Sequence, residues 1–146
     1  MAQFNSKHGI VSRRKEELYM AFADMRNFTA MLPEDKKQAV QADYDTIKAT
    51  VQGFTVGVRV SGRVPYSLIQ LQDSDAPFHF GVSLCFDDAP EPGKTDFHID
   101  IDADINMMMK VMLGNKISDA LDKVVDGLVA VSEGRMPEGM PSDFKI

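Results

Sequence analysis

The feature that most constrains this chain is a strict alternation of apolar and polar residues in two segments of its second half. Every second residue is apolar from Phe78 to Phe86, and again from Phe97 to Ile105. The intervening positions carry polar or small residues, namely His79, Gly81, Ser83 and Cys85, and then His98, Asp100, Asp102 and Asp104. A period of two places one face of a strand in a core and the other in water, as is typical of antiparallel sheets.

Weaker alternation precedes these segments. Ile47 to Val51 and Phe54 to Val60 follow the same pattern, and residues 2–11 read as a further strand. The connections are short and contain turn residues, as in Gln52-Gly53 and Asp87 to Gly93. Because short links cannot cross over a sheet, we expect an antiparallel meander and about seven strands in all.

A long helix is predicted at the C-terminal end. Asn106 can cap it, because an asparagine side chain accepts a hydrogen bond from a free backbone N–H of the first turn. Apolar residues recur at helical spacing from Met109 to Leu128, and Gly134 ends the pattern just after Ser132.

Two short helices are predicted after the first strand. Leu18, Phe22 and Met25 share one face of the first, which Ser12 can cap, and the second ends before Pro33. The cluster Arg13-Arg14-Lys15 opposes the helix dipole in a first turn. Either the helix begins after this cluster, or the cluster receives an anion. A tolerated, solvated cluster is the simpler interpretation.

These elements predict an α+β fold in which a curved antiparallel sheet wraps around the long C-terminal helix, the only element large enough to cover one face. The stretch from Asp102 to Gly114 resembles the strand-to-helix junction of small bacterial START-like (SRPBCC) proteins. Asp24 to Phe28, followed by Met31-Leu32-Pro33, resembles the end of their paired short helices. The resemblance covers roughly residues 2–130. It implies the helix-grip fold, as in birch-pollen-allergen-like proteins, and a cavity between sheet and helix. It carries over no catalytic residue.

Length and charge restrict the class further. The 146 residues suit one domain, and we assign residues 1–133 to a single START-like helix-grip domain, with a Pro/Gly/Met-rich tail at residues 134–146. The net charge of −6 excludes the electrostatic footprint of a nucleic-acid-binding protein. We expect no integral membrane segment, because no apolar stretch approaches about 20 residues. A single cysteine and the absence of a secretory signal at the N-terminus predict a cytoplasmic protein.

The predicted ligand site is the cavity between sheet and helix. Methionines crowd the start of the long helix and are expected to face Met25 and Met31 at its mouth, where a flexible side chain suits varied apolar shapes. Filling gaps in an ordinary core is the alternative reading of these methionines. Arg59 and Tyr66 are the polar groups best able to orient a ligand head. The predicted ligand-binding residues are Met25, Phe28, Phe54, Val58, Arg59, Tyr66, Phe80, Leu84, Phe97, Ile99, Met109, Met112 and Ile117.

Two clusters of candidate ligand or catalytic residues lie outside the predicted cavity. One strand face carries, about 7 Å apart, Asp96, His98, Asp100, Asp102 and Asp104. Adjacent members hold a divalent cation only with a third ligand from a neighbouring strand. A solvated face is the simpler interpretation. Cys85 and His98 can approach across the hairpin, but an inert, half-buried cysteine is the simpler assignment. No metal, cofactor or catalytic residue is therefore predicted.

Three functions follow from these patterns. The leading one is a module that binds a hydrophobic small molecule, lipid-like or aromatic, without catalysis. The alternative is a polyketide cyclase or dehydratase-like enzyme that uses the same pocket. It requires at least two titratable side chains in the cavity. A homodimer or scaffold with a vestigial cavity is the third.

Overall fold

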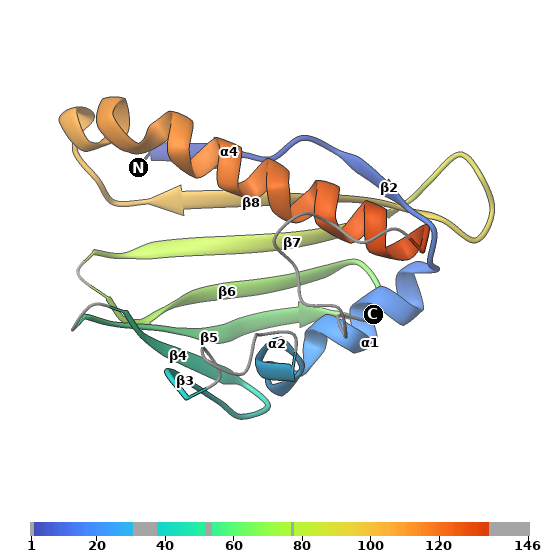
Figure 1. The fold of residues 1–146 in the computed structure, drawn as a ribbon, viewed down its shortest axis with the longest axis horizontal. Coiled ribbons are helices and arrows are strands. Elements are labelled where there is room, and N and C mark those ends of the chain that lie inside the picture. The colour runs from blue at the N-terminus through green and yellow to red at the C-terminus, as the bar shows by residue number, and fades with distance from the viewer. Residues whose placement is uncertain (1, 31–37, 52–53, 77, 135–146) are drawn as a thin grey trace.

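The computed structural model describes residues 2–30, 38–51, 54–76 and 78–134. Eight strands form one curved antiparallel sheet in the order β1-β8-β7-β6-β5-β4-β3, and β2 also pairs with β8 (Figure 1). The strands are β1 (Ala2–Asn5), β2 (Gly9–Val11), β3 (Val40–Ala42), β4 (Thr46–Val51), β5 (Phe54–Val64), β6 (Leu68–Asp75), β7 (Phe80–Asp88) and β8 (Thr95–Ala103). From β3 to β8, strands that are consecutive in the chain are hydrogen-bonded neighbours, which confirms the predicted meander.

The N-terminal segment differs from the prediction of one strand over residues 2–11. It forms two strands, because at Ser6 the side-chain oxygen takes the place of a backbone carbonyl in the hydrogen-bond ladder. Ser6 N donates to Ile99 O and Ser6 Oγ accepts from Ile99 N, both at 2.8 Å. The two short helices therefore follow β2 and do not directly follow β1.

These helices are α1 (Lys15–Ala23) and α2 (Arg26–Ala30). The N-cap of α1 is Arg14 rather than Ser12, so the helix begins later than predicted. Two of the three basic residues, Arg13 and Arg14, thus precede the helix. Arg13 Nη1 donates to the carbonyl oxygens of Ser12 and Ser132, at 2.8 and 3.0 Å.

The C-terminal helix α4 (Met107–Ser132) confirms the predicted bounds. Asn106 Oδ1 accepts from the backbone N–H of Met109 at 2.8 Å, so the predicted cap is present. At the other end the backbone of Gly134 has a φ of +80°, a conformation that glycine adopts without strain. Helix α4 crosses the concave face of the sheet above β1, β2 and β8, and α1 packs on β6 and β7 (Figure 1).

The densest part of the core lies where α1, the sheet and the C-terminal half of α4 meet. Phe22, Phe86 and Phe97 form an aromatic cluster with ring centroids 5.4–6.1 Å apart. Leu18 and Val125 complete it, each fully buried. We call this region the closed end of the grip.

Candidate functional site

Burial of the inward-facing side chains falls along β6 and β7 away from the closed end. On β7, Phe86 and Leu84 are buried, whereas Val82 and Phe80 are only partly buried. On β6, Ile69 is fully buried and Leu71 is not. Because side chains two apart on a strand share a face, this difference reflects what covers the sheet.

Helix α4 shows the same gradient along its apolar stripe. Leu128, Val125 and Leu121 are buried in its C-terminal half. Ile117 and Leu113 are partly buried, and Met112 is exposed. The apolar stripe of α4 is therefore less buried toward the N-terminus of the helix. We call this region the open end of the grip.

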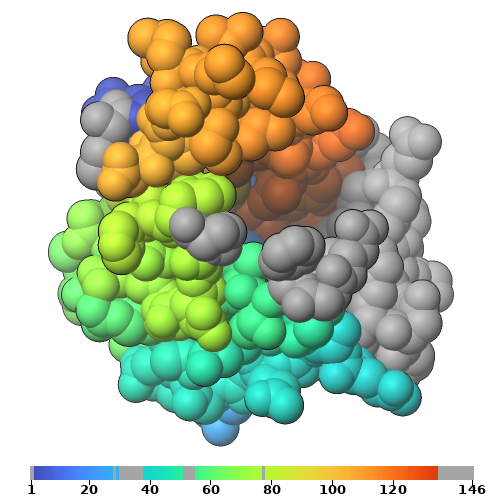
Figure 2. All heavy atoms as spheres, turned by 90° about the vertical axis from the view of Figure 1, so that its left-hand side faces the viewer, coloured from blue at the N-terminus to red at the C-terminus, as the bar shows by residue number. Residues whose placement is uncertain are grey.

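Figure 2 views the molecule from the open end. The surface is hollowed between α4 and the strands of the sheet. Apolar side chains that pack against the core while only partly buried include Val60, Leu71, Phe80, Val82, Ile101 and Ile117. The inward positions of β7 and β8 carry only apolar side chains there, so the hollow has an apolar wall on the sheet side.

The predicted site residues divide between the two ends. Met25, Leu84, Phe97 and Ile99 belong to the solid core, with exposures of 0–8%. Val58, Phe80, Met109 and Ile117 are partly exposed and lie toward the open end. The side chains of Phe28 and Phe54 lie outside the described part of the structure, as does Met31.

Neither polar residue proposed to orient a ligand faces the hollow. Arg59 is exposed on the opposite face of the sheet, because its neighbours Val58 and Val60 point inward. Tyr66 lies in the β5–β6 turn with a φ of 65°, and its ring meets Tyr19 of α1 edge-on at 5.5 Å. Tyr66 therefore belongs to the closed end.

The methionines do not form one common wall. Met25 is fully buried after α1, with its N–H donating to Tyr44 O at 3.2 Å. Met107, Met108 and Met112 begin α4 and are 67–74% exposed. The start of α1 lies beside the far end of α4, where Ser12 N donates to Ser132 Oγ at 2.9 Å. Met25 therefore does not face the start of α4 as expected, and Met31 lies outside the described residues.

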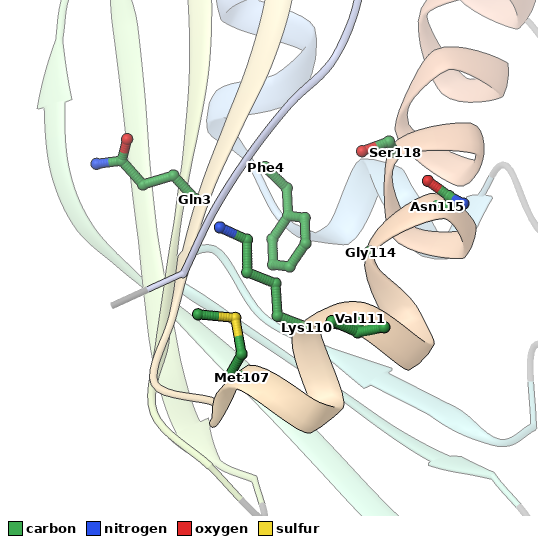
Figure 3. A pocket seen from close by; sticks show the side chains of 8 residues that line it. All are labelled: Gln3, Phe4, Met107, Lys110, Val111, Gly114, Asn115 and Ser118. Atoms are coloured by element: carbon green, nitrogen blue, oxygen red, sulfur yellow. The ribbon is translucent and has the colours of Figure 1, made fainter.

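A second depression lies beside the first turns of α4, between this helix and β1. It measures about 400 Å³. The Phe4 ring points toward Gly114 at its floor, and Gln3, Lys110 and Asn115 lie around it (Figure 3). None of these residues was predicted from the sequence. The one available sequence signal is Gly114, which interrupts the apolar helical stretch. A Cβ atom added at Gly114 would lie 3.5 Å from Phe4 Cε1.

One residue that sequence reasoning missed fixes the corner between the helices and the sheet. Arg63 Nη2 donates to Ala23 O at 2.7 Å, and Arg63 Nη1 pairs with Asp45 at 2.8 Å. Its guanidinium also lies over the Tyr44 ring, 4.3 Å from the centroid. Arg63 joins α1 to the β3–β4 turn and is occupied by these contacts.

The perturbed pKa values nearest the open end belong to Asp73 and His79. The backbone N–H of Phe80 and the His79 ring, which lies 2.9 Å from Asp73 Oδ2, lower the pKa of Asp73. The same pair raises the pKa of His79. Burial raises the pKa of the Cys85 thiol to about 11, and nearby Asp100 adds to the effect. A cysteine with a raised pKa is a poor nucleophile at neutral pH, so the structure does not favour a Cys85–His98 catalytic pair.

Comparison with known proteins supports the fold. No protein-family model matches the sequence, and no curated protein matches it. Among solved structures, a START superfamily protein from Mycobacterium smegmatis aligns with a TM-score of 0.57 at 13% identity, covering 86% of this chain and 98% of that one. A protein from Thermobifida fusca aligns with a TM-score of 0.68 at 12% identity, covering 92% and 94%.

A third neighbour is the Aha1 dimer from Colwellia psychrerythraea, with a TM-score of 0.55 at 13% identity, covering 84% and 97%. Identities this low establish the architecture and nothing finer. The chain thus has the START-like helix-grip fold, as its sequence predicted. Within the described residues, no helix is long and apolar enough to cross a membrane.

Proposed function

We propose that this protein binds a hydrophobic small molecule, lipid-like or aromatic, in the hollow between α4 and the sheet at the open end. The observation that carries the proposal is the burial gradient. Four apolar side chains face inward from the central strands and are left partly uncovered, namely Val60, Leu71, Val82 and Ile101. Exposed apolar surface in a concave site is the usual basis of small-molecule binding.

Binding without catalysis fits the chemistry of this wall. At the inward positions of β7 and β8 the ligand would meet aliphatic and aromatic carbon and no ionisable group. The cyclase or dehydratase alternative needs an acid and a base in the same place. The Asp73–His79 pair lies at the β6–β7 end, but the His79 side chain is 83% exposed. We therefore favour a carrier or sensor over an enzyme.

The test is a titration with the neutral apolar fluorophore N-phenyl-1-naphthylamine, whose emission rises in an apolar site. We expect saturable binding of one probe per chain. The substitution Val82→Phe places a ring in the hollow and should weaken probe binding at least 10-fold, because the added volume competes with the probe.

The matched control is Val124→Phe, which makes the same change on the exposed side of α4. It should leave the affinity unchanged. The proposal fails if no saturable binding occurs, or if both variants weaken binding equally.

A homodimer is a second proposal, carried by a different observation. Met107, Met108, Val111 and Met112 share one face of α4 and are 67–75% exposed. One structural neighbour is described as a dimer. Sedimentation velocity should show a dimer that Val111→Lys dissociates. A wild-type monomer at high concentration would contradict this proposal.

We place the functional unit in residues 1–133, with residues 134–146 as a tail, and we place the protein in the cytoplasm. Limited proteolysis tests the first, since cleavage in the tail should leave probe binding intact.

A further inference from the structure

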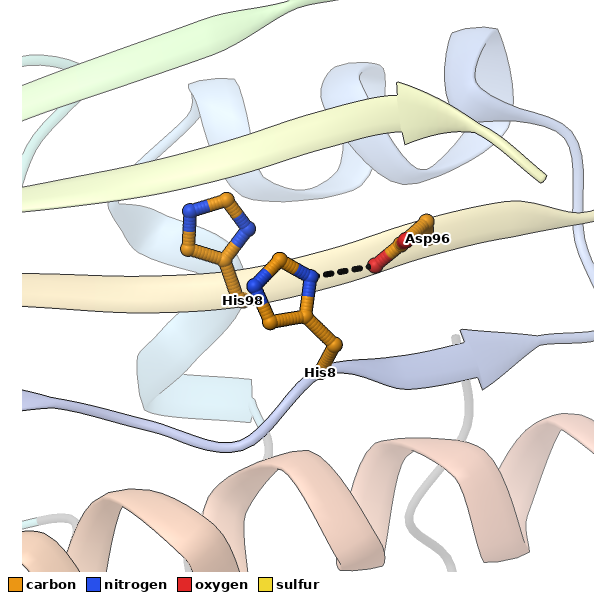
Figure 4. Close-up of side chains that lie close together, drawn as sticks. All are labelled: His8, Asp96 and His98. Atoms are coloured by element: carbon orange, nitrogen blue, oxygen red, sulfur yellow. Dashed lines mark hydrogen bonds and ion pairs between the residues drawn. The ribbon is translucent and has the colours of Figure 1, made fainter.

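A cluster of nitrogen and oxygen ligands lies on the outer face of the sheet, opposite the hollow. From the sequence alone, a cation site there required a third ligand from a neighbouring strand. The structure supplies one, because the link between β1 and β2 places His8 against β8. His8 Nδ1 lies 2.9 Å from Asp96 Oδ1, and the His8 and His98 rings stack with centroids 4.2 Å apart (Figure 4).

The His98 ring has one nitrogen engaged and one free. His98 Nε2 lies 3.3 Å from Asp100 Oδ2. His98 Nδ1 is buried and has no hydrogen-bond partner among the described residues. A buried polar atom without a partner is uncommon and calls for an explanation. In Figure 4 one nitrogen of each histidine ring points to the side where Asp96 lies.

We propose that His8, Asp96 and His98 form a binding site for a first-row divalent transition metal of the zinc class. One ligand atom from each residue lies within 4.8 Å of the others. Ligands around tetrahedral zinc are about 3.4 Å apart, so a small side-chain movement completes the site. Two imidazoles and a carboxylate suit Zn²⁺, Co²⁺ and Ni²⁺, whereas Mg²⁺ and Ca²⁺ prefer oxygen ligands.

The surroundings provide the remaining parts of such a site. Asp100 beside His98 Nε2 matches the carboxylate–histidine–metal arrangement, in which the second ring nitrogen donates to a carboxylate and orients the ligand. A metal ion binds an imidazole in the plane of the ring, so the His8 ring must turn out of its stack with His98. It can do so because the His8 side chain is 59% exposed. A bound ion would fix the β1–β2 link to β8.

A competing group shares His98. The ligand atoms of Cys85, His98 and Asp100 also lie within 4.8 Å of one another. The distances are longer, however, with Cys85 Sγ 4.0 Å from Asp100 Oδ2. This group also includes Asp100, whose carboxylate already pairs with His98 Nε2. We therefore assign the ion to the His8 side and treat Cys85 as a discriminating variant.

The experiment is calorimetric titration of tag-free protein with Zn²⁺ alone, together with the visible absorption spectrum of the Co²⁺-loaded protein. We expect one ion per chain and a rise in Tm of about 5–10 °C at 100 times the dissociation constant. His8→Ala should weaken Zn²⁺ binding at least 10-fold. Asp100→Asn should weaken it about 10-fold by removing the orienting carboxylate.

The control is His79→Ala, which removes an exposed histidine paired with Asp73 elsewhere on the molecule. Neither His79→Ala nor Cys85→Ser should change the affinity. Because His8 is exposed, its loss leaves the fold intact, and Tm without metal verifies this. The proposal is overturned if Zn²⁺ does not bind saturably, if His8→Ala binds as the wild type does, or if Cys85→Ser abolishes binding.

Discussion

The two ends of the grip are built from the same strands and the same helix, yet they pack differently. At the closed end α1 and the C-terminal half of α4 cover the sheet, and Phe86 and Phe97 are 1% exposed. At the open end α4 lies over β1 and β8 while Val82 and Leu71 keep accessible surface. One end therefore provides stability, and the other leaves apolar wall free for a ligand.

The largest expected effect compares two phenylalanines. Phe97→Ala at the closed end should lower the free energy of unfolding by about 3–5 kcal/mol, because it leaves a cavity in a solid core. Phe80→Ala at the open end should lower it by about 1 kcal/mol, since that ring is only partly buried. Urea denaturation measures both. Equal losses would remove the distinction between the ends.

Two glycines sharpen the same comparison. A methyl group at Gly9 would lie 2.5 Å from Val125 Cγ1 and 2.8 Å from Val129 Cγ2. Gly9→Ala should therefore destabilise the protein by about 1–3 kcal/mol. Gly114→Ala meets only Phe4 at 3.5 Å and lies inside α4, so it should stabilise by about 0.5–1 kcal/mol. Opposite signs in thermal unfolding support the account, whereas a loss of stability in both variants counts against it.

The cap of α4 tests how the open end is held. Asn106→Ala removes the acceptor for the Met109 N–H and should cost about 1 kcal/mol. Its control is Asn115→Ala, an exposed change within the same helix, which should be neutral or slightly stabilising. Amide exchange in the first turn of α4 should quicken in the first variant only.

The smallest effect concerns pH and the Asp73–His79 pair. The raised pKa of His79 stabilises the fold below the ordinary histidine value of 6.5, and this contribution disappears as pH rises through the raised value. The lowered pKa of Asp73 stabilises above 3.8 and is lost as pH falls through the lowered value. His79→Ala should therefore lower Tm slightly near pH 5.5 and leave it unchanged at pH 9. A larger loss at pH 9 would contradict this sign.

Local signals explain what could be predicted. Asn106 and Gly134 mark the ends of α4 because caps depend on the residue itself, and the alternation around Phe86 and Phe97 fixed which face is buried. The same alternation could not place Arg63. The pairing of β5 with β6 shifts between Val60 and Gly62, so an extra residue changes which face the rest of β5 presents.

The candidate site was harder to predict because it depends on distances between elements. Periodicity places Phe80 and Phe97 on one face alike, but it does not show that Phe97 is buried and Phe80 only partly buried. Similarly, His98 and Asp96 were identified on one strand, whereas His8 reaches them only through the break after Ser6. That break is set by tertiary hydrogen bonds with β8.

The most direct test of the two-ended account is a methyl-resolved NMR titration with N-phenyl-1-naphthylamine. The methyl signals of Val82, Ile101 and Ile117 at the open end should shift as the probe saturates. Those of Val11, Ile69 and Val125, which are fully buried at the closed end, should stay in place. Shifts confined to the closed end, or spread equally over both ends, would contradict the account.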